Sequence, residues 1–346
     1  MSIPQAFRPA VDRALTAAFG TNVLDAALPL GGGLSGAGIF KIRVGGIAYL
    51  LRIEVERDGF RDPARAYACM KIAADGLLAP RLRHADAEDG VTIMDFIEER
   101  SLTLDYRGTR EDLIVEAAQG VRALHAGPAF PPLVDYLDGM DALVVQFEAR
   151  NLVSREAMGE LLGLYRRLRQ NYRTTAGDLV ASHNDLNPRN ILYDGARLWF
   201  VDWESAFLAD RYVDLSCIAN LFASSPEQED LLLRTYFGRV DVEMRARLYL
   251  MRQVNHLFYG LVMTNAVAPR NAPAESLDGP SLDDLHVALS LGEPVLDTDE
   301  GRFGYVKARL AQAGQGLRAP RFEEALAELA SDPAAAPSSL EAAAGR

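Results

Sequence analysis

Cysteine is scarce in this sequence, because only Cys69 and Cys217 occur among its 346 residues. They stand far apart, each in an apolar helical pattern, which argues against a disulfide framework or a zinc site and suits a reducing compartment. The chain also lacks an apolar run of about eighteen residues, which argues against a transmembrane helix. Its first residues lack the continuous apolar segment of a signal peptide. We therefore expect a soluble cytoplasmic protein.

Basic residues are outnumbered, with 36 Lys and Arg against 48 Asp and Glu, so the net charge is −12. This balance argues against nucleic acid or an anionic membrane as the main partner, and it is mildly consistent with cationic ligands. Internal repeats are absent as well. The length allows two lobes with a core each, and the oligomeric state is left open.

The first part of the chain is predicted to be a small α+β unit with an antiparallel sheet, because the apolar residues alternate with a period of two. Gly45-Gly46 marks a tight turn between two of the strands. The expected elements are helices at 3–19 and 63–74, strands at 39–44, 47–55 and 91–97, and an acidic turn at 84–90. We interpret residues 1–97 as an N-terminal nucleotide-binding lobe.

Beyond residue 97 the apolar residues recur mostly at helical spacing. Helices are expected at 110–125, 141–151, 155–173, 212–222, 227–237 and 242–266, with Pro-rich loops at 127–139 and 269–280. Residues 331–346 hold too little apolar bulk to pack, so we expect a disordered tail. Residues 98–330 are then a larger, mainly helical C-terminal catalytic and substrate-binding lobe. A cleft between two such lobes is a common place for ligands.

The segment GGGLSG at residues 31–36 formally satisfies the dinucleotide motif G-x-G-x-x-G. That motif has to open a helix, but strand residues follow here, and no Gly-Lys-Ser/Thr follows to make a P-loop. The remaining interpretation is a turn between antiparallel strands whose N–H groups approach a phosphate. Taken alone, the motif fits a plain hairpin tip equally well.

The most informative stretch is ASHNDLNPRNILYDG at residues 181–195. Asp185 and Asn190 lie five residues apart, and His183 stands two residues before the acid. Asp194-Gly195 signals a hairpin turn, and the returning strand ends at Asp202. The loop and the hairpin are therefore expected to bring Asp185, Asn190 and Asp202 to one edge of the fold.

These residue types suit phosphoryl transfer. Mg²⁺ prefers hard oxygen ligands and usually takes only one or two from the protein, a role that fits Asn190 and Asp202. A further carboxylate, Asp185, can orient an attacking hydroxyl and accept its proton. An isolated Asp or Asn is usually a turn residue, and His183 fits a structural hydrogen bond better than a catalytic role. The combined spacing favours a catalytic loop.

The stretch SHNDLNPRNILYDGARLWFVDWESAFLADRYVDL resembles the catalytic and metal-binding segments of the aminoglycoside phosphotransferase-like kinases. The resemblance covers roughly residues 28–268 and points more narrowly to the choline/ethanolamine kinase branch. It implies an α+β, bilobal, protein-kinase-like fold with ATP and Mg²⁺ as cofactors. It also implies Asp185 as the base, Asn190 and Asp202 as the Mg²⁺ ligands, and Asp214 as a buried anchor of the loop.

The same resemblance implies a set of nucleotide-contacting residues. They are Gly32, Gly33, Leu34, Ser35 and Gly36 in the glycine loop, Arg52 as the phosphate-contacting cation, and Asp95, Phe96 and Ile97 at the adenine hinge. The family often has Lys at the Arg52 position, paired with a Glu from the next helix, but residues 61–75 contain no Glu. An Arg stays charged and can bind phosphate in a bidentate manner, and its ion-pair partner is left open here.

A site for choline or ethanolamine needs negative charge and aromatic faces, since each cation–π contact contributes roughly 0.5–2 kcal/mol. Trp203 and Glu204, just past the metal acid, can supply one of each. Phe258 and Tyr259 lie on a helix that resembles the one lining the amino-alcohol pocket, although a plain helix-core pair fits them equally well.

The predicted function is therefore phosphorylation of a hydroxyl on a small cationic molecule of the choline or ethanolamine kind. The alternative is a kinase for an aminoglycoside or another small alcohol, with the acidic loop at 275–284 forming a groove. An alternative of another class is a non-catalytic nucleotide-sensing module. The presence of Asp185, Asn190 and Asp202 together disfavours that module.

Overall fold

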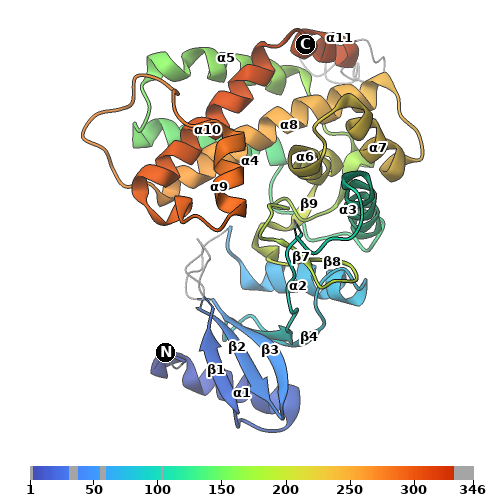
Figure 1. The fold of residues 1–346 in the computed structure, drawn as a ribbon, viewed down its shortest axis with the longest axis vertical. Coiled ribbons are helices and arrows are strands. Elements are labelled where there is room, and N and C mark those ends of the chain that lie inside the picture. The colour runs from blue at the N-terminus through green and yellow to red at the C-terminus, as the bar shows by residue number, and fades with distance from the viewer. Residues whose placement is uncertain (1–2, 31–37, 55–59, 103, 331–346) are drawn as a thin grey trace, which may run out of the picture. The chain divides into compact units, whose positions relative to one another are not determined.

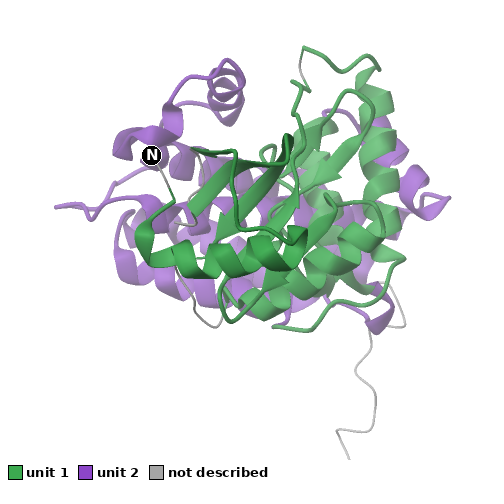
Figure 2. Ribbon diagram, turned by 90° about the horizontal axis from the view of Figure 1, so that it is seen from below, with its two compact units in different colours: residues 1–133, 179–223 green, residues 134–178, 224–346 purple. Residues whose placement is uncertain are grey.

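The computed structural model describes residues 3–30, 38–54, 60–102 and 104–330. The described chain divides into two compact units, one of residues up to 133 together with 179–223, the other of 134–178 together with residues from 224 onward (Figure 2). The glycine-loop residues Gly32, Gly33, Leu34, Ser35 and Gly36, and the tail predicted at 331–346, lie outside the described residues. The lobe boundary near residue 97 remains a prediction, because compact units need not coincide with lobes.

The first unit contains an antiparallel five-stranded sheet with the order β1-β2-β3-β5-β4 (Figure 1). Its strands are β1 Ala26–Pro29, β2 Gly38–Val44, β3 Ile47–Ile53, β4 Leu82–Asp86 and β5 Val91–Asp95. Gly45 and Gly46 both have positive φ, and Val44 pairs with Ile47, which confirms the predicted turn. Helix α1, Arg8–Phe19, buries Leu15 in the core that this sheet forms.

The acidic segment predicted as a turn at 84–90 is partly a strand, so that prediction was wrong in extent. Strand β4 continues to Asp86, which pairs with Val91 of β5, and Gly90 takes a positive φ of 66° in the short turn between them. Strand β4 is at the edge of the sheet and pairs only with β5. An edge strand can expose polar side chains, so its sequence looks like a turn.

The rest of the first unit combines short strands with helices. Strands β6 Leu179–Ser182 and β9 Phe207–Asp210 form one antiparallel pair, and β7 Ile191–Tyr193 and β8 Leu198–Phe200 form another. The helices are α2 Pro63–Asp75, α3 Arg110–His125 and α6 Arg211–Phe222. The predicted hairpin around Asp194-Gly195 is confirmed by the β7–β8 register, in which Ile191 lies opposite Phe200.

The second unit is helical. Its helices are α4 Tyr136–Arg150, α5 Arg155–Asn171, α7 Pro226–Phe237, α8 Val242–Met263, α9 Leu282–Ser290, α10 Asp299–Arg318 and α11 Pro320–Ala330. Helix α4 begins inside the predicted loop, because the carboxylate of Asp135 accepts the N–H groups of Leu137 and Asp138 and so caps the helix. Helices α9 to α11 are not delimited by the sequence patterns. The loop predicted at 269–280 is confirmed.

Helix α8 is the buried centre of the second unit, and α10 packs against it (Figure 1). Their contact depends on Gly260, where an added Cβ would lie 2.9 Å from Cδ2 and 3.0 Å from Cγ of the fully buried Leu310. The Tyr249 hydroxyl donates to the Gly316 carbonyl at 2.6 Å farther along the same pair of helices.

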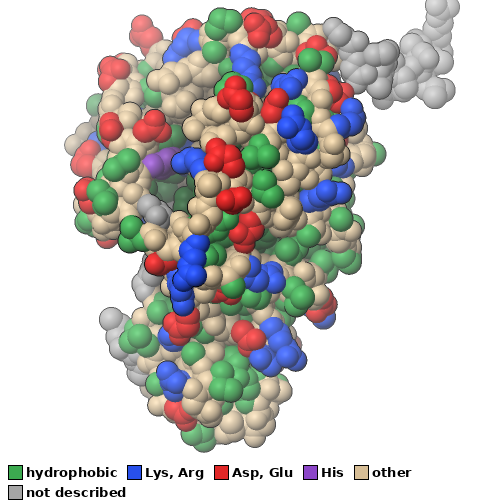
Figure 3. All heavy atoms as spheres, turned by 45° about the vertical axis from the view of Figure 1, so that its right-hand side comes forward, with side chains coloured by type: hydrophobic (Ala, Val, Ile, Leu, Met, Phe, Trp, Pro, Cys, Tyr) green, Lys and Arg blue, Asp and Glu red, His purple; other side chains and the backbone are tan. Residues whose placement is uncertain are grey.

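Side chains of both charges are interspersed on the face shown in Figure 3. No described helix is long and apolar enough to cross a membrane.

Gly260→Ala should lower the free energy of unfolding by about 1–3 kcal/mol, because the new methyl group overpacks a core that cannot yield. Gly163→Ala is the matched control, since an added Cβ in the middle of α5 meets no atom within 4 Å. That change should raise stability by up to about 1 kcal/mol through helix propensity. Urea unfolding of both variants measures the two effects, and equal changes would contradict close α8–α10 packing.

Candidate active site

The loop between β6 and β7 carries the predicted base. The Nδ2 of Asn190 donates to the backbone carbonyl of Asp185 at 2.8 Å and to its carboxylate at 3.1 Å. The Nδ2 of Asn187 donates to the other carboxylate oxygen at 3.1 Å. Two amides therefore hold the half-buried carboxylate of Asp185 in a fixed orientation, with Asn190 beside it as the sequence predicts.

Asp214 on α6 fixes the start of this loop. Its fully buried carboxylate accepts the backbone N–H groups of His183 and Asn184, each at 2.8 Å, and lies 3.0 Å from Nε2 of His125. Burial alone would raise the pKa of Asp214, but the hydrogen bond and charge of His125, with those of His183, lower it below its ordinary value. The carboxylate is therefore ionised, which is the form that accepts all three donors.

Two residues of the loop bind the segment that follows β8. The buried Nε2 of His183 donates to the carbonyl of Val201 at 2.9 Å, and Nδ2 of Asn184 donates to the carbonyl of Ser205 at 2.9 Å. Asn184 has a φ of 65°, an unusual conformation for a residue with a side chain. His183 and Asn184 thus join the two segments into one connected framework.

Asn190 and Asp202 meet the requirements for Mg²⁺. The Asn190 carbonyl accepts the N–H of Val201 at 3.0 Å, which places Asn190 next to Asp202 across the hairpin. Because Asn190 donates through Nδ2, its Oδ1 is the atom left to bind a metal. Asp202 is 37% exposed at its side chain, has a φ of 67° and uses only one oxygen in its ion pair with Arg52. Two oxygen ligands of this kind, with phosphate and water, fit an octahedral Mg²⁺.

Arg52 on β3 is surrounded by carboxylates. Its Nε lies 2.5 Å from Glu54, its Nη1 lies 3.0 Å from Asp202, and its Nη2 pairs with Glu204. Burial alone would lower the pKa of Arg52, but Asp202 and Glu54 raise it above its ordinary value. Three carboxylates around one guanidinium leave a formal charge of about −2, which a divalent cation would neutralise.

The ion-pair partner that the sequence left open is therefore Glu54, one residue past the end of β3, together with Glu204. Residues two apart in an extended chain point to the same side, so Glu54 is well placed for this contact. Helix α2 contributes Arg65 instead of a Glu. Its buried guanidinium donates to the carbonyl of Glu204 at 2.8 Å and to that of Ala206. Arg65 could not be recognised from the sequence, because an Arg in a helix usually faces solvent.

The predicted adenine hinge follows β5. The Asp95 carboxylate pairs with Arg83 at 2.6 Å, and the ammonium group of Lys41 lies 4.0 Å from the centre of the Phe96 ring. Within the described residues, the backbone groups of Phe96 and Ile97 make no hydrogen bond with another backbone group. Backbone donors and acceptors of this kind, just past the end of β5, are suited to the polar edge of a base.

The residues predicted to contact the substrate lie in different surroundings. Trp203 differs from the prediction, because its side chain is only 2% exposed and its ring packs 4.5 Å from the His183 ring. It supports the catalytic loop rather than offering a free face to a ligand. The Glu204 carboxylate is engaged by Arg52. Phe258 and Tyr259 belong to helix α8 of the second unit, with ring centres 5.3 Å apart.

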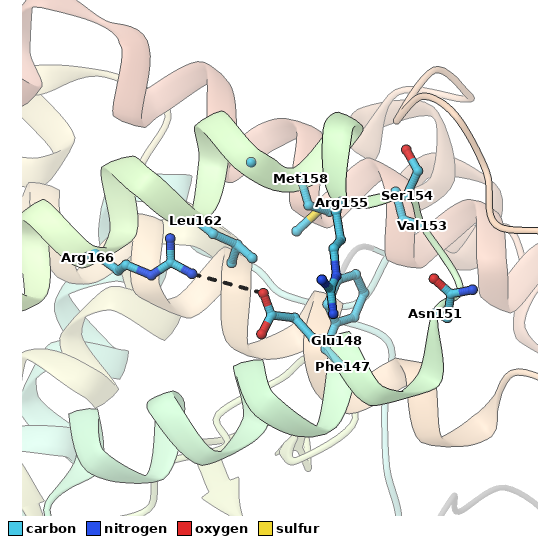
Figure 4. A pocket seen from close by; sticks show the side chains of 10 residues that line it. Phe147, Glu148, Asn151, Val153, Ser154, Arg155, Met158, Leu162 and Arg166 are labelled. Atoms are coloured by element: carbon cyan, nitrogen blue, oxygen red, sulfur yellow. Dashed lines mark ion pairs between the residues drawn. The ribbon is translucent and has the colours of Figure 1, made fainter.

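A separate pocket of about 280 Å³ lies in the second unit between the end of α4 and the start of α5 (Figure 4). Phe147, Met158 and Leu162 are buried at its base, and Glu148 pairs with Arg166 at 4.0 Å on its rim. None of the residues predicted to bind ATP, Mg²⁺ or the acceptor lines it. The pocket therefore plays no part in the candidate active site.

The sequence profile of the phosphotransferase enzyme family matches residues 27–249, more than half of the chain and including all the catalytic-loop residues. The chain belongs to this family. Protein LicA of Haemophilus influenzae is 44% identical over 59 residues, a match that covers 17% of this chain and 22% of LicA. The chain thus matches about a fifth of the length of that relative.

Solved structures of similar fold extend the likeness over most of the chain. A choline/ethanolamine kinase family protein from Mesorhizobium loti has a TM-score of 0.66 at 21% identity, covering 93% of this chain and 99% of that chain. The gentamicin complex of APH(2″)-IIa has a TM-score of 0.57 at 13% identity, covering 90% and 97%. At such identities the likeness shows the fold, and it confirms the predicted α+β, protein-kinase-like fold class.

Asp214→Asn should lower the free energy of unfolding by about 2–4 kcal/mol at pH 7. The reason is that an amide has no negative charge and only one oxygen with which to accept hydrogen bonds from three donors. The folded pKa of Asp214 is below its unfolded value, so the ionised form stabilises the fold above about pH 4. That contribution disappears as the pH falls through the folded pKa. The deficit of the variant should therefore shrink in urea titrations below pH 4.

Asp62→Asn is the control for this measurement. Asp62 caps α2 by accepting one N–H, from Ala64 at 2.9 Å, and Asn caps a helix equally well. Its stability should change by less than about 0.5 kcal/mol at either pH. A deficit of Asp214→Asn that stayed constant with pH would show that the charge of Asp214 is not what holds the loop.

Glu54→Gln should raise the KM for ATP about 3- to 10-fold with a smaller change in kcat, because Arg52 loses the charge that orients its Nε. Glu54→Asp should recover part of the loss. Glu88→Gln, at an exposed turn residue of the same unit, is the control and should leave KM unchanged. Steady-state kinetics with varied ATP measures the effect, and an unaltered KM in Glu54→Gln would remove Glu54 from this role.

Proposed function

We propose that this chain is an ATP- and Mg²⁺-dependent kinase that transfers the γ-phosphoryl group of ATP to a hydroxyl of a small molecule. The observation that supports this most strongly is the connected framework around Asp185, Asn190 and Asp202. The loop and the metal-binding segment are joined by His183 and Asn184, and all of these residues belong to one compact unit. Phosphoryl transfer depends mainly on positioning and charge, which such a framework provides.

Each residue has a defined part in the proposed reaction. The Asp185 carboxylate, oriented by Asn187 and Asn190, accepts a hydrogen bond from the acceptor hydroxyl and takes its proton as the phosphoryl group is transferred. Asn190 and Asp202 would hold Mg²⁺, which supplies positive charge to the phosphate oxygens when it is bound. Arg52 presents a permanent cation beside Asp202 for the phosphates. Phe96 and Ile97 offer their backbone groups to the adenine.

The proposed acceptor class is a small alcohol, with an amino alcohol of the choline or ethanolamine kind favoured by the sequence resemblance. The fold likeness to a choline/ethanolamine kinase family protein supports this class. The fold likeness to a phosphotransferase solved with gentamicin keeps an aminoglycoside as the alternative. The same catalytic framework serves either acceptor, because the fold by itself does not determine the substrate.

Asp185→Asn should lower kcat by about 10²- to 10⁴-fold while the Kd for ATP changes by less than about threefold, because the variant keeps the loop but loses the base. The measurement is Mg²⁺-dependent ADP release with choline, ethanolamine, gentamicin and small sugar alcohols as acceptors. Asp75→Asn is the control, since Asp75 is an exposed residue paired with Lys71 at the end of α2.

Stimulation of ADP release by one acceptor class, lost in Asp185→Asn and kept in Asp75→Asn, would establish the kinase and its acceptor class. Near-normal turnover of Asp185→Asn would exclude Asp185 as the base. ATP binding without stimulation by any acceptor would contradict the proposed acceptor classes and favour the nucleotide-sensing module.

A further inference from the structure

The pocket between the end of α4 and the start of α5 lies within the second unit, and one face of α5 forms much of its wall. Residues three or four positions apart share a face of a helix. The residues of this face are Arg155, Met158, Gly159, Leu162 and Arg166. An added Cβ at Gly159 would meet no atom within 4 Å, so the lack of a side chain there contributes to the volume of the pocket.

The floor of the pocket is apolar. Phe147, Val153, Met158 and Leu162 line it, and each is at most 5% exposed. Burial of apolar ligand surface against such a floor is favourable, by about 25 cal/mol per Å². The volume of about 280 Å³ is near the lower end for ligand pockets. The floor therefore suits a single ring or a short alkyl chain rather than a large cofactor.

The rim of the pocket carries more positive than negative charge. Arg155 has no ion pair or side-chain hydrogen bond in the described part of the chain, and its side chain extends from α5 toward α4 (Figure 4). Arg166 pairs with Glu148 at 4.0 Å, which is too long for a hydrogen bond. Both guanidinium groups therefore keep N–H donors for a ligand. The described lining includes one acid, so the rim has one net positive charge on a chain whose net charge is −12.

A carboxylate matches this rim better than other charged groups do. Its single negative charge neutralises the net charge of the lining, whereas a dianionic phosphate monoester would leave an excess of negative charge close to Glu148. The two oxygens of a carboxylate also match the paired N–H groups of a guanidinium. An organic cation would be repelled by Arg155, whose charge no carboxylate of the described chain neutralises.

We propose that this pocket is a binding site for a small organic carboxylate that carries one ring or a short alkyl chain. Arg155 and Arg166 bind the carboxylate at the rim, and the apolar part packs against Phe147, Met158 and Leu162. The proposal is independent of the phosphoryl transfer proposed above, because every lining residue belongs to the second unit and the catalytic framework belongs to the first.

Titration calorimetry on the full chain, without nucleotide or Mg²⁺, tests this site with benzoate and hexanoate. At least one of the two should bind at a single saturable site. Its neutral amide, benzamide or hexanamide, should bind at least about tenfold more weakly, because it lacks the charge. Acetate should also bind at least about tenfold more weakly, because it lacks the apolar part. Phenyl phosphate should bind more weakly than benzoate.

Two substitutions at the rim should act in opposite directions. Arg155→Gln should weaken carboxylate binding at least about fivefold, and Glu148→Gln should tighten it about two- to fivefold by removing repulsion and releasing Arg166. Arg167→Gln is the matched control, since Arg167 also lies on α5 but pairs with Glu323 at 2.8 Å and does not line the pocket. It should change the Kd by less than about twofold.

Gly159→Leu tests the shape of the site, because the new side chain would fill the pocket and should weaken binding at least about tenfold. Gly163→Leu is the matched control, one turn farther along α5. An added Cβ there also meets no atom within 4 Å, and Gly163 does not line the pocket. Thermal unfolding checks that each variant folds, and a bound carboxylate should raise the melting temperature of the wild-type protein.

The proposal is overturned if neither benzoate nor hexanoate binds, or if the neutral amide binds as tightly as its carboxylate. Equal effects of Gly159→Leu and Gly163→Leu would show that the ligand binds elsewhere. Tighter binding of phenyl phosphate than of benzoate would contradict the assignment to a carboxylate. If Gly159→Leu does not fold, the rim variants decide, and an unchanged Kd in both Arg155→Gln and Glu148→Gln would exclude the pocket.

Discussion

The geometry of the active site depends first on the buried carboxylate of Asp214. One side chain on α6 accepts the N–H groups of two successive loop residues, His183 and Asn184, and a third donor from His125. Consecutive N–H groups can point to one acceptor only when the backbone turns sharply, and Asn184 has a positive φ at that point. The carboxylate supplies the free energy that holds this turn. The position of Asp185, one residue later, follows from it.

The side chains of His183 and Asn184, which begin at this turn, bind the segment after β8. Asp214 therefore positions two loops. The carbonyl groups of Val201 and Ser205 are held on either side of Asp202, which itself has a positive φ. The buried ring of Trp203 packs against the His183 ring and so supports the framework. The base and the metal-binding acid thus come from different loops but depend on the same carboxylate. Loss of Asp214 would disturb both at once.

Much of this arrangement could be predicted because it is encoded locally. The spacing of Asp185 and Asn190, and the Asp194-Gly195 turn that returns the chain to Asp202, depend on short segments whose geometry follows from residue type. The strands β2 and β3, with their glycine turn, were predicted for the same reason. The edge strand β4 could be predicted only in part, because one of its faces is packed and the other exposes polar residues.

Contacts between residues far apart in the sequence could not be predicted in this way. Glu54 is the partner of Arg52, but the partnership also requires Glu204, which is 152 residues later and is brought close only by the fold. The same holds for Arg65, whose buried guanidinium binds carbonyl groups of the metal-binding segment. Trp203 was predicted to contact the substrate because it neighbours Asp202 in sequence. Adjacent residues can face opposite ways, and its ring faces the core.

Arg52 and Arg309 show that two buried guanidinium groups of one chain can have entirely different partners. Arg52 is buried among three carboxylates, so its surroundings retain negative charge and favour a divalent cation. Arg309 on α10 is buried among phenol and imidazole groups of the second unit, and its guanidinium lies against the Tyr259 ring of α8. Aromatic residues on a helix therefore do not by themselves indicate a binding site for ammonium groups. A cation of the protein itself can stack on such a ring, as Arg309 does on Tyr259.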